Sequence, residues 1–339
     1  MYAWVVSRPA PLEAGPLRLQ ERPAPQPGPG ELLIDVAFCG VCHTDLHVIE
    51  GELPPHQPAT VPGHQVIGRV IGRGPGVDAQ AWPDGKAVGV AWLYRACGVC
   101  TACQRGQENL CEQAQFTGWD HDGGYSEQMV APANFVYPLD ESLFRPQTAP
   151  LLCAGIIGWR SLRLANVSAG DRLALFGFGA SAHLVVQVAK AQGIECFVFT
   201  RAPHHQQLAK ELGAVWVGMP DARPPVLCDG AITFTPTGAS IPQALGAVRS
   251  GGTVAVNAVH LDGVPAFDYG LLYGERVLRS VANATREDGR TFLRQAAQME
   301  LQPVVRCYAA DQTPQALADL KASRLSGSAV VVWKERLPQ

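Results

Sequence analysis

Four closely spaced cysteines constrain the fold of this chain more than any other feature. They follow the pattern C-x2-C-x2-C-x7-C and are Cys97, Cys100, Cys103 and Cys111. Four thiolates reach one ion only if the chain wraps around it, and a closed tetrahedral set of sulfur ligands suits structural zinc. An iron-sulfur cluster is one alternative, but the spacing matches neither ferredoxin pattern. A disulfide pair is another, and no secretion signal favours it. We expect a structural zinc lobe over about residues 92–112.

The composition limits the partners that the chain can bind. Its 339 residues include 30 acidic residues and 27 lysines and arginines, which gives a net charge of -3. A chain with this balance has no general positive field that would hold nucleic acid or an anionic membrane. It also has no apolar stretch near the ~18 residues that a membrane helix needs. We expect a globular cytoplasmic protein of two domains, at roughly 150 residues per domain.

The two halves of the chain differ in their pattern of apolar residues. Up to about residue 150, short apolar runs such as residues 31–36 and 66–71 alternate with turn residues, as in a β-rich domain. From Asp171 onward, apolar runs alternate with segments of helical periodicity. That order predicts a doubly wound parallel sheet, the Rossmann architecture.

A glycine-rich turn in the second half indicates a dinucleotide site. Gly177, Gly179 and Ala182 form a G-x-G-x-x-A motif between an expected strand and an expected helix, which is the context that the motif requires. The next strand ends at Thr200 and Arg201, where an NAD enzyme would place an acidic residue. A hydroxyl and a guanidinium suit a 2′-phosphate, so NADP(H) is favoured over NAD(H).

A second group of metal-binding residue types is dispersed along the first half. Cys42 follows an expected strand, His64 follows a turn at Pro62, and Cys153 lies in an apolar segment. A single buried cysteine or histidine is usually a core residue. Together, however, two thiolates and an imidazole would supply three ligands and leave a fourth position open, as in a catalytic zinc site.

In combination these motifs resemble the zinc-dependent alcohol dehydrogenases of the medium-chain dehydrogenase/reductase superfamily. The resemblance covers essentially the whole chain and rests on the runs CGVCHTD at 39–45, GH at 63–64, GGYSE at 123–127 and LCAG at 152–155, together with the four-cysteine lobe and the cofactor turn. It implies a β-rich GroES-like catalytic domain at residues 1–150 and 286–339, with a Rossmann cofactor domain at 151–285 between them.

The resemblance also assigns roles to individual residues. It implies that Cys42, His64 and Cys153 bind a catalytic zinc, so that each chain holds two zinc ions, and that Asp45 orients a ligand imidazole. Thr44 and His47 match a proton relay between the substrate oxygen and solvent. Hydride would pass between the carbon of an alcohol, aldehyde or ketone and the nicotinamide.

The chain departs from the family at Gln65, because the family usually has glutamate after the glycine-histidine pair. Glutamine lacks the negative charge, which leaves the metal site more electropositive and weakens its hold on zinc.

Three other functions compete with a dehydrogenase. A zinc-free quinone or enone reductase would share the fold but would not need Cys42, His64 and Cys153. A catalytically silent scaffold would retain only the structural zinc, and Gln65 is the one sign of it. A nucleic-acid-binding zinc module is opposed by the charge balance. A homodimer or homotetramer is typical of the family, and no feature of the sequence favours one over the other.

Overall fold

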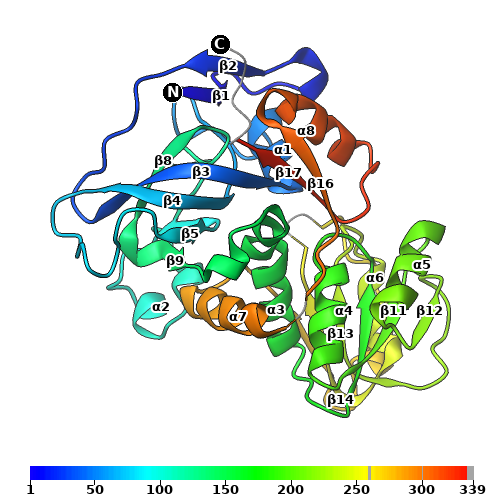
Figure 1. The fold of residues 1–339 in the computed structure, drawn as a ribbon. Helices are drawn as coiled ribbons and strands as arrows, with labels where there is room; N and C mark the ends of the chain where they lie inside the picture. Colours follow the sequence, from blue (N-terminus) through cyan, green and yellow to red (C-terminus); the bar gives the residue numbers. More distant parts are fainter. Residues whose placement is uncertain (259–260, 300, 334–339) are drawn as a thin grey trace. The chain divides into compact units, whose positions relative to one another are not determined.

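The computed structural model describes residues 1–258, 261–299 and 301–333. The chain forms two compact units. The first comprises Met1–Cys153, Thr285–Ala297 and Pro303–Gln339, and the second comprises Ala154–Ala284 and Gln298–Gln302. Figure 1 colours both along the sequence. Among the described residues, no helix is both long and apolar enough to cross a membrane.

The first unit is built on a β-sheet of seven strands. Six strands follow the order β16, β17, β3, β4, β5, β9, and β8 pairs with β3. The antiparallel pair β3 and β4 runs through the middle, and Leu32, Ile34 and Val36 of β3 alternate into the core. The strands are β3 (Glu31–Val41), β4 (Gln65–Arg73), β5 (Ala87–Val90), β8 (Gln128–Pro132), β9 (Val136–Pro138), β16 (Val305–Ala309) and β17 (Ser328–Val332).

The C-terminal part of the chain returns to this sheet. Strand β17 pairs antiparallel with β3, and Val331 lies opposite Cys39. The remaining strands of the unit form two small ladders, β1 (Tyr2–Val6) with β2 (Leu17–Glu21) and β6 (Leu93–Arg95) with β7 (Gln115–Phe116). The helices are α1 (His43–Glu50), α2 (Thr101–Gln104), α7 (Arg286–Gln298) and α8 (Thr313–Lys321). The short 3-10 helices are η1 (Leu12–Ala14), η2 (Glu108–Leu110), η3 (Ala133–Phe135), η4 (Glu141–Leu143), η5 (Pro146–Leu152) and η7 (Ala310–Gln312).

The second unit is a doubly wound parallel sheet, as the sequence predicts. Its six strands follow the order β12, β11, β10, β13, β14, β15, and all neighbours are parallel. The order reverses between β10 and β13, which is where such sheets bind ligands. The elements are β10 (Arg172–Phe176), β11 (Glu195–Phe199), β12 (Trp216–Gly218), β13 (Cys228–Thr233), β14 (Val248–Val256), β15 (Val277–Ser280), α3 (Ala154–Leu164), α4 (Ala182–Ala191), α5 (Pro203–Leu212), α6 (Ser240–Ala247) and η6 (Tyr269–Leu271).

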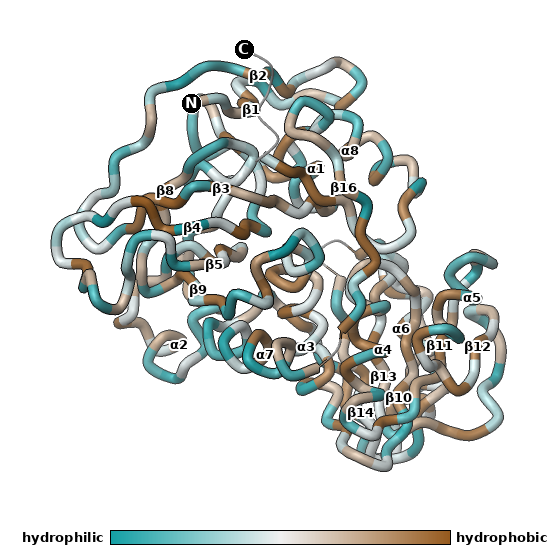
Figure 2. Tube along the Cα trace, in the orientation of Figure 1, coloured by the Kyte–Doolittle hydropathy of each residue, from teal (hydrophilic) through white to brown (hydrophobic). Residues whose placement is uncertain are grey.

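Strands β10 and β11 of this sheet are apolar on both faces. Phe176 and Phe199 stack with ring centroids 4.2 Å apart and belong to a buried cluster that includes Ile241 of α6. The intervening residues Leu175 and Val198 are also fully buried. Figure 2 shows β11 as a hydrophobic stretch. A strand that is buried on both faces requires helices on both sides of the sheet, in agreement with the alternation of apolar runs and helical segments that predicted this architecture.

Candidate active site

The first unit brings together the three dispersed metal-binding residue types. Cys42 is the N-cap residue of α1, His64 lies directly before β4, and Cys153 follows η5. Their candidate ligand atoms all lie within 4.8 Å of one another. The Sγ of Cys42 is 3.3 Å from Nε2 of His64. Two sulfurs and one imidazole nitrogen at this spacing form a donor set that suits zinc and leaves a fourth position open.

The turn that presents His64 depends on glycine. Gly63 has a φ of +98°, a conformation that side chains rarely adopt. A Cβ atom at this position would also lie 2.6 Å from Cδ1 of Tyr125. Any other residue would therefore move the backbone that carries the histidine.

Asp45 connects two of the three candidate ligands. Its carboxylate accepts hydrogen bonds from Nδ1 of His64 at 3.0 Å, from the backbone N–H of Cys42 at 2.9 Å and from the hydroxyl of Tyr125 at 3.0 Å. Asp45 is 1% exposed and is not a solvated loop residue. Because Nδ1 of His64 is bound to Asp45, Nε2 is directed toward the sulfur of Cys42. No local pattern in the sequence predicted the contact between Asp45 and Tyr125, which lie 80 residues apart.

The charges of this group favour a bound cation. The nearby sulfur of Cys153 and burial raise the pKa of Cys42 well above its ordinary value. Burial opposes a charge on His64, but Asp45 and Cys42 outweigh burial and raise the pKa of His64 to about 10. A positive charge among sulfur, imidazole and carboxylate groups that lie this close together would stabilise the whole group. The donor chemistry therefore fits a divalent metal ion.

Gln65 lies beside this group and is 2% exposed. Its Nε2 is buried without a hydrogen-bond partner in the described part of the chain. A glutamate would place a carboxylate oxygen where this amide donor now stands unpaired. The substitution of the family's glutamate thus leaves a neutral group whose donor capacity is unused.

The two residues of the expected proton relay lie on α1. Thr44 is in the first turn, and His47 is one turn further along the helix. Nδ1 of His47 lies 2.6 Å from a carboxylate oxygen of Glu52. The side chain of Glu52 is 56% exposed, so this pair reaches solvent. The sequence did not reveal Glu52 as a partner of His47.

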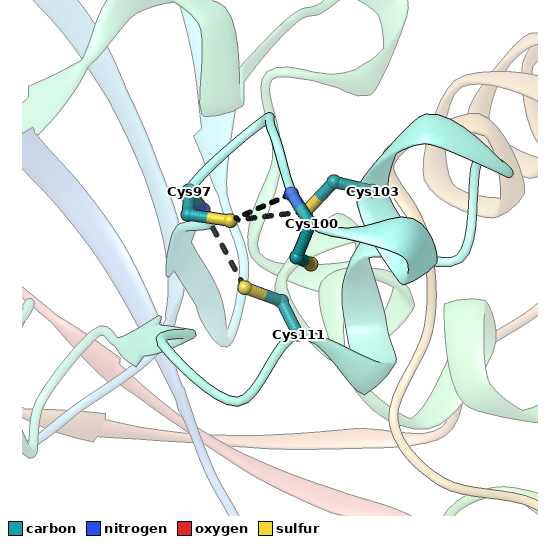
Figure 3. A group of neighbouring side chains, drawn as sticks. All are labelled: Cys97, Cys100, Cys103 and Cys111. Atoms are coloured by element: carbon teal, nitrogen blue, oxygen red, sulfur yellow. Dashed lines mark hydrogen bonds between the residues drawn. The ribbon is translucent and has the colours of Figure 1, made fainter.

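The four cysteines of the lobe converge. Their sulfur atoms also lie within 4.8 Å of one another, and Figure 3 shows them directed toward one another. Backbone N–H groups of Val99 and Cys100 hydrogen-bond to Cys97 and lower the pKa of its thiol to about 6. These contacts stabilise a thiolate, which is the form that binds metal. Four sulfur donors leave no open position, as in structural zinc sites.

The glycine-rich turn of the second unit joins β10 to α4. Gly177 has a φ of +89°, and a Cβ atom there would lie 2.8 Å from Cγ2 of Thr235. At Gly179 a Cβ atom would meet nothing within 4 Å, so the backbone borders open space. Ala182 is fully buried in the first turn of α4. A small residue there allows close packing, and the open space at Gly179 could admit a pyrophosphate.

The strand next to this turn ends without an acidic residue. Thr200 follows β11 and is buried, with its N–H donating to the carbonyl of Gly218 at 3.0 Å. The carbonyl of Thr200 accepts a hydrogen bond from Nε2 of Gln206 at 2.9 Å. Arg201 is exposed, and no ion pair joins it to a carboxylate within residues 1–258, 261–299 and 301–333.

Comparison with known proteins identifies relatives over the full length of the chain. Residues 28–141 match the family model described as the alcohol dehydrogenase GroES-like domain. The chain is 46% identical to a probable alcohol dehydrogenase, AdhA, of Mycobacterium tuberculosis, over 98% of this chain and 97% of the relative.

Solved structures of alcohol dehydrogenases share the fold of this chain. A cinnamyl alcohol dehydrogenase of Sorghum bicolor matches with a TM-score of 0.89 and 26% identity, over 100% of this chain and 99% of that one. A thermostable alcohol dehydrogenase of Pyrobaculum aerophilum, with cobalt and zinc bound, matches with a TM-score of 0.87 and 27% identity, over 98% and 99%. The fold, the whole-chain identity and the candidate metal site agree with one another, and the chain belongs to the zinc-dependent alcohol dehydrogenases of the medium-chain dehydrogenase/reductase superfamily.

Proposed function

We propose that this NAD(P)-dependent alcohol dehydrogenase transfers hydride at the site formed by Cys42, His64 and Cys153. The observation that carries the proposal is the convergence of their ligand atoms within 4.8 Å, inside one unit of the fold. When bound there, zinc supplies Lewis acidity toward the substrate oxygen, and the nicotinamide supplies the hydride acceptor or donor. The first unit would then be the catalytic domain and the second the cofactor domain.

The chain's own residues prepare this site. Asp45 fixes the ring of His64 through Nδ1 and leaves Nε2 available for the metal. Thr44 would exchange a proton with the substrate oxygen, and His47 would exchange it with solvent beside Glu52. Because residue 65 is a neutral glutamine, no second carboxylate stands beside the metal at this position.

The four-cysteine lobe would hold a second, structural zinc. Its contribution is to folding, because a closed set of thiolates stabilises the loop that provides them. Glu108 of this lobe also accepts hydrogen bonds from the backbone N–H and the Nε of Arg286, each at 3.0 Å. The lobe is thus tied to the start of α7.

The cofactor is NADP(H) in this proposal. Thr200 and the exposed Arg201 stand where an acidic residue would bind the ribose of NAD(H). Replacing Arg201 with alanine should lower the preference for NADP over NAD by at least about tenfold, the loss of one charge-assisted phosphate contact. An unchanged ratio of the two kcat/KM values would refute this part of the proposal and leave the reaction class intact.

The reaction is tested by following the transferred hydrogen. An alcohol that carries deuterium on its carbinol carbon is incubated with the zinc-loaded protein and with NAD and NADP in parallel. We expect deuterium at C4 of the reduced nicotinamide. A zinc-free quinone or enone reductase would give no such transfer but would consume reduced cofactor with an enone, and a silent scaffold would do neither.

A further inference from the structure

A group of aromatic rings begins at one of the candidate metal ligands. The indole of Trp92 meets the ring of His64 edge-on, with centroids 4.9 Å apart. The ring of Trp119 is nearly parallel to that of Trp92, at 6.1 Å and an interplanar angle of 8°. Phe116 lies 5.0 Å from Trp92 and 5.8 Å from Trp119, again within about 22° of parallel. Three nearly parallel aromatic rings thus form a group that starts next to a candidate metal ligand.

Two contacts from a separate loop fix the orientation of Trp119. The indole Nε1 donates a hydrogen bond to the carbonyl of Pro54 at 2.8 Å. The imidazole of His56 stacks on the indole with centroids 4.2 Å apart and an angle of 26°. Trp119 is held by the segment 54–56 as well as by its own loop, which limits the rotation of a large half-buried side chain.

Asp120 in turn fixes His56. Its Oδ1 lies 2.6 Å from Nδ1 of His56, and its Oδ2 accepts a hydrogen bond from the backbone N–H of Phe116 at 2.8 Å. The backbone carbonyl of Asp120 accepts a hydrogen bond from Nε2 of Gln57 at 2.6 Å. One residue therefore joins the two loops and holds the imidazole against the indole. Neither His56 nor Asp120 belongs to the candidate metal site.

We propose that His56 and Asp120 are positioning residues for Trp119, and that they make the enzyme select alcohols and aldehydes whose reacting carbon bears a flat aromatic or conjugated group. The proposal rests on the function proposed above. An indole that is already fixed loses no rotational freedom when a substrate ring stacks on it, so the whole stacking contribution appears as binding. A saturated substituent of the same size has no aromatic face and gains little from the fixed orientation.

Benzyl alcohol and cyclohexylmethanol are similar in size, but only benzyl alcohol has an aromatic ring that can stack on an indole. Comparing them separates the stacking contribution from the other contributions to binding. We expect the His56→Ala protein to have a KM for benzyl alcohol raised by about five- to tenfold, as the loss of one aromatic contact predicts. Its KM for cyclohexylmethanol should change by less than about twofold, with the two kcat values altered by similar small factors. His121→Ala is the matched control, because His121 lies two residues after Trp119 but stacks on Tyr94, with ring centroids 3.9 Å apart.

Two further variants test whether the ring of His56 or its contact with Asp120 is responsible for the effect. His56→Phe keeps a ring beside Trp119 and should restore most of the preference for benzyl alcohol. Asp120→Asn keeps an oxygen that can accept the N–H of Phe116 but removes the charge opposite His56, and it should give an intermediate preference. Near-ultraviolet circular dichroism gives a readout that is independent of turnover. The signal from the coupled indoles of Trp92 and Trp119 should fall in His56→Ala and persist in His56→Phe and His121→Ala.

The proposal is overturned if His56→Ala raises the KM values of both alcohols equally, or if it changes neither KM value. It is overturned as well if His121→Ala raises the KM for benzyl alcohol selectively. It is also overturned if the preference is lost while the indole signal is unchanged. These results would leave the dehydrogenase assignment in place. A wild-type protein that transfers no deuterium from any labelled alcohol to the nicotinamide would instead contradict the proposed function itself.

Discussion

A buried histidine beside the cofactor turn should make the protein sensitive to acid. His183 lies in the first turn of α4 and is 1% exposed. Its backbone N–H donates to the carbonyl of Gly179 in the glycine-rich turn at 3.1 Å. Burial disfavours the charged imidazolium and lowers the pKa of His183 from 6.5 to about 4. The unfolded chain therefore takes up this proton at a higher pH than the folded protein does.

The sign and size of the effect follow from this difference. The folded-state pKa is depressed, so the stabilisation is fully present above about pH 6.5 and is lost as the pH falls toward about 4. At ~1.4 kcal/mol per pKa unit, the full loss is about 3 kcal/mol. Integration between the two pKa values gives about 2 kcal/mol between roughly pH 7.5 and pH 5.

The assay is denaturant unfolding of wild-type protein and His183→Gln at these two pH values. Wild-type protein should lose about 2 kcal/mol more of its free energy of unfolding than the variant does. His204→Gln, which removes an exposed histidine of the same unit, should behave as wild type. Equal losses in wild type and His183→Gln would show that the buried imidazole does not carry the acid sensitivity, and would refute the reasoning.

Three further predictions concern the metal sites. Cys97→Ser should lose one zinc per chain and lower the thermal midpoint by at least about 5 °C, with less effect on turnover per folded molecule; calorimetry and metal analysis check this, and an unchanged midpoint would contradict a structural role. Asp45→Asn should weaken zinc binding at His64 by about 10- to 100-fold, because it removes the carboxylate that accepts a hydrogen bond from Nδ1 of His64. A competitive zinc titration measures this loss, and wild-type affinity would remove Asp45 from its proposed role. Gln65→Glu should slow zinc release to a chelator by about tenfold, because it adds a carboxylate beside the metal. Release at the wild-type rate would show that the missing charge does not control zinc retention.

The sequence predicted the fold well where local pattern determines structure. The apolar runs on either side of Gly177 and Gly179 specify a strand, a tight turn and a helix without reference to distant residues, and the parallel sheet follows from their repetition. The return of β17 to β3 could be inferred only from the resemblance, because strands far apart in the sequence pair through tertiary packing. Short edge strands such as β16 carry no strong periodic signal.

The candidate site was less visible in the sequence. The spacing of Cys97 and its three neighbours suggests a metal lobe without further information, since the ligands are close in the chain. Cys42, His64 and Cys153 are far apart, and only the family pattern links them. The contact between Tyr125 and Asp45 and the stacking of His56 on Trp119 join residues 80 and more than 60 positions apart. No local pattern encodes such contacts.

The most direct test of the central claim is the zinc content and alcohol-dependent cofactor reduction of Cys153→Ser, measured against wild type. Wild-type protein should hold zinc at both candidate sites. The variant should retain the zinc of the four-cysteine lobe, lose most of the zinc bound with Cys42 and His64, and lose at least about 1000-fold in kcat/KM while its thermal midpoint stays within a few degrees of wild type. A variant with wild-type zinc content and wild-type turnover would contradict the assignment of this site.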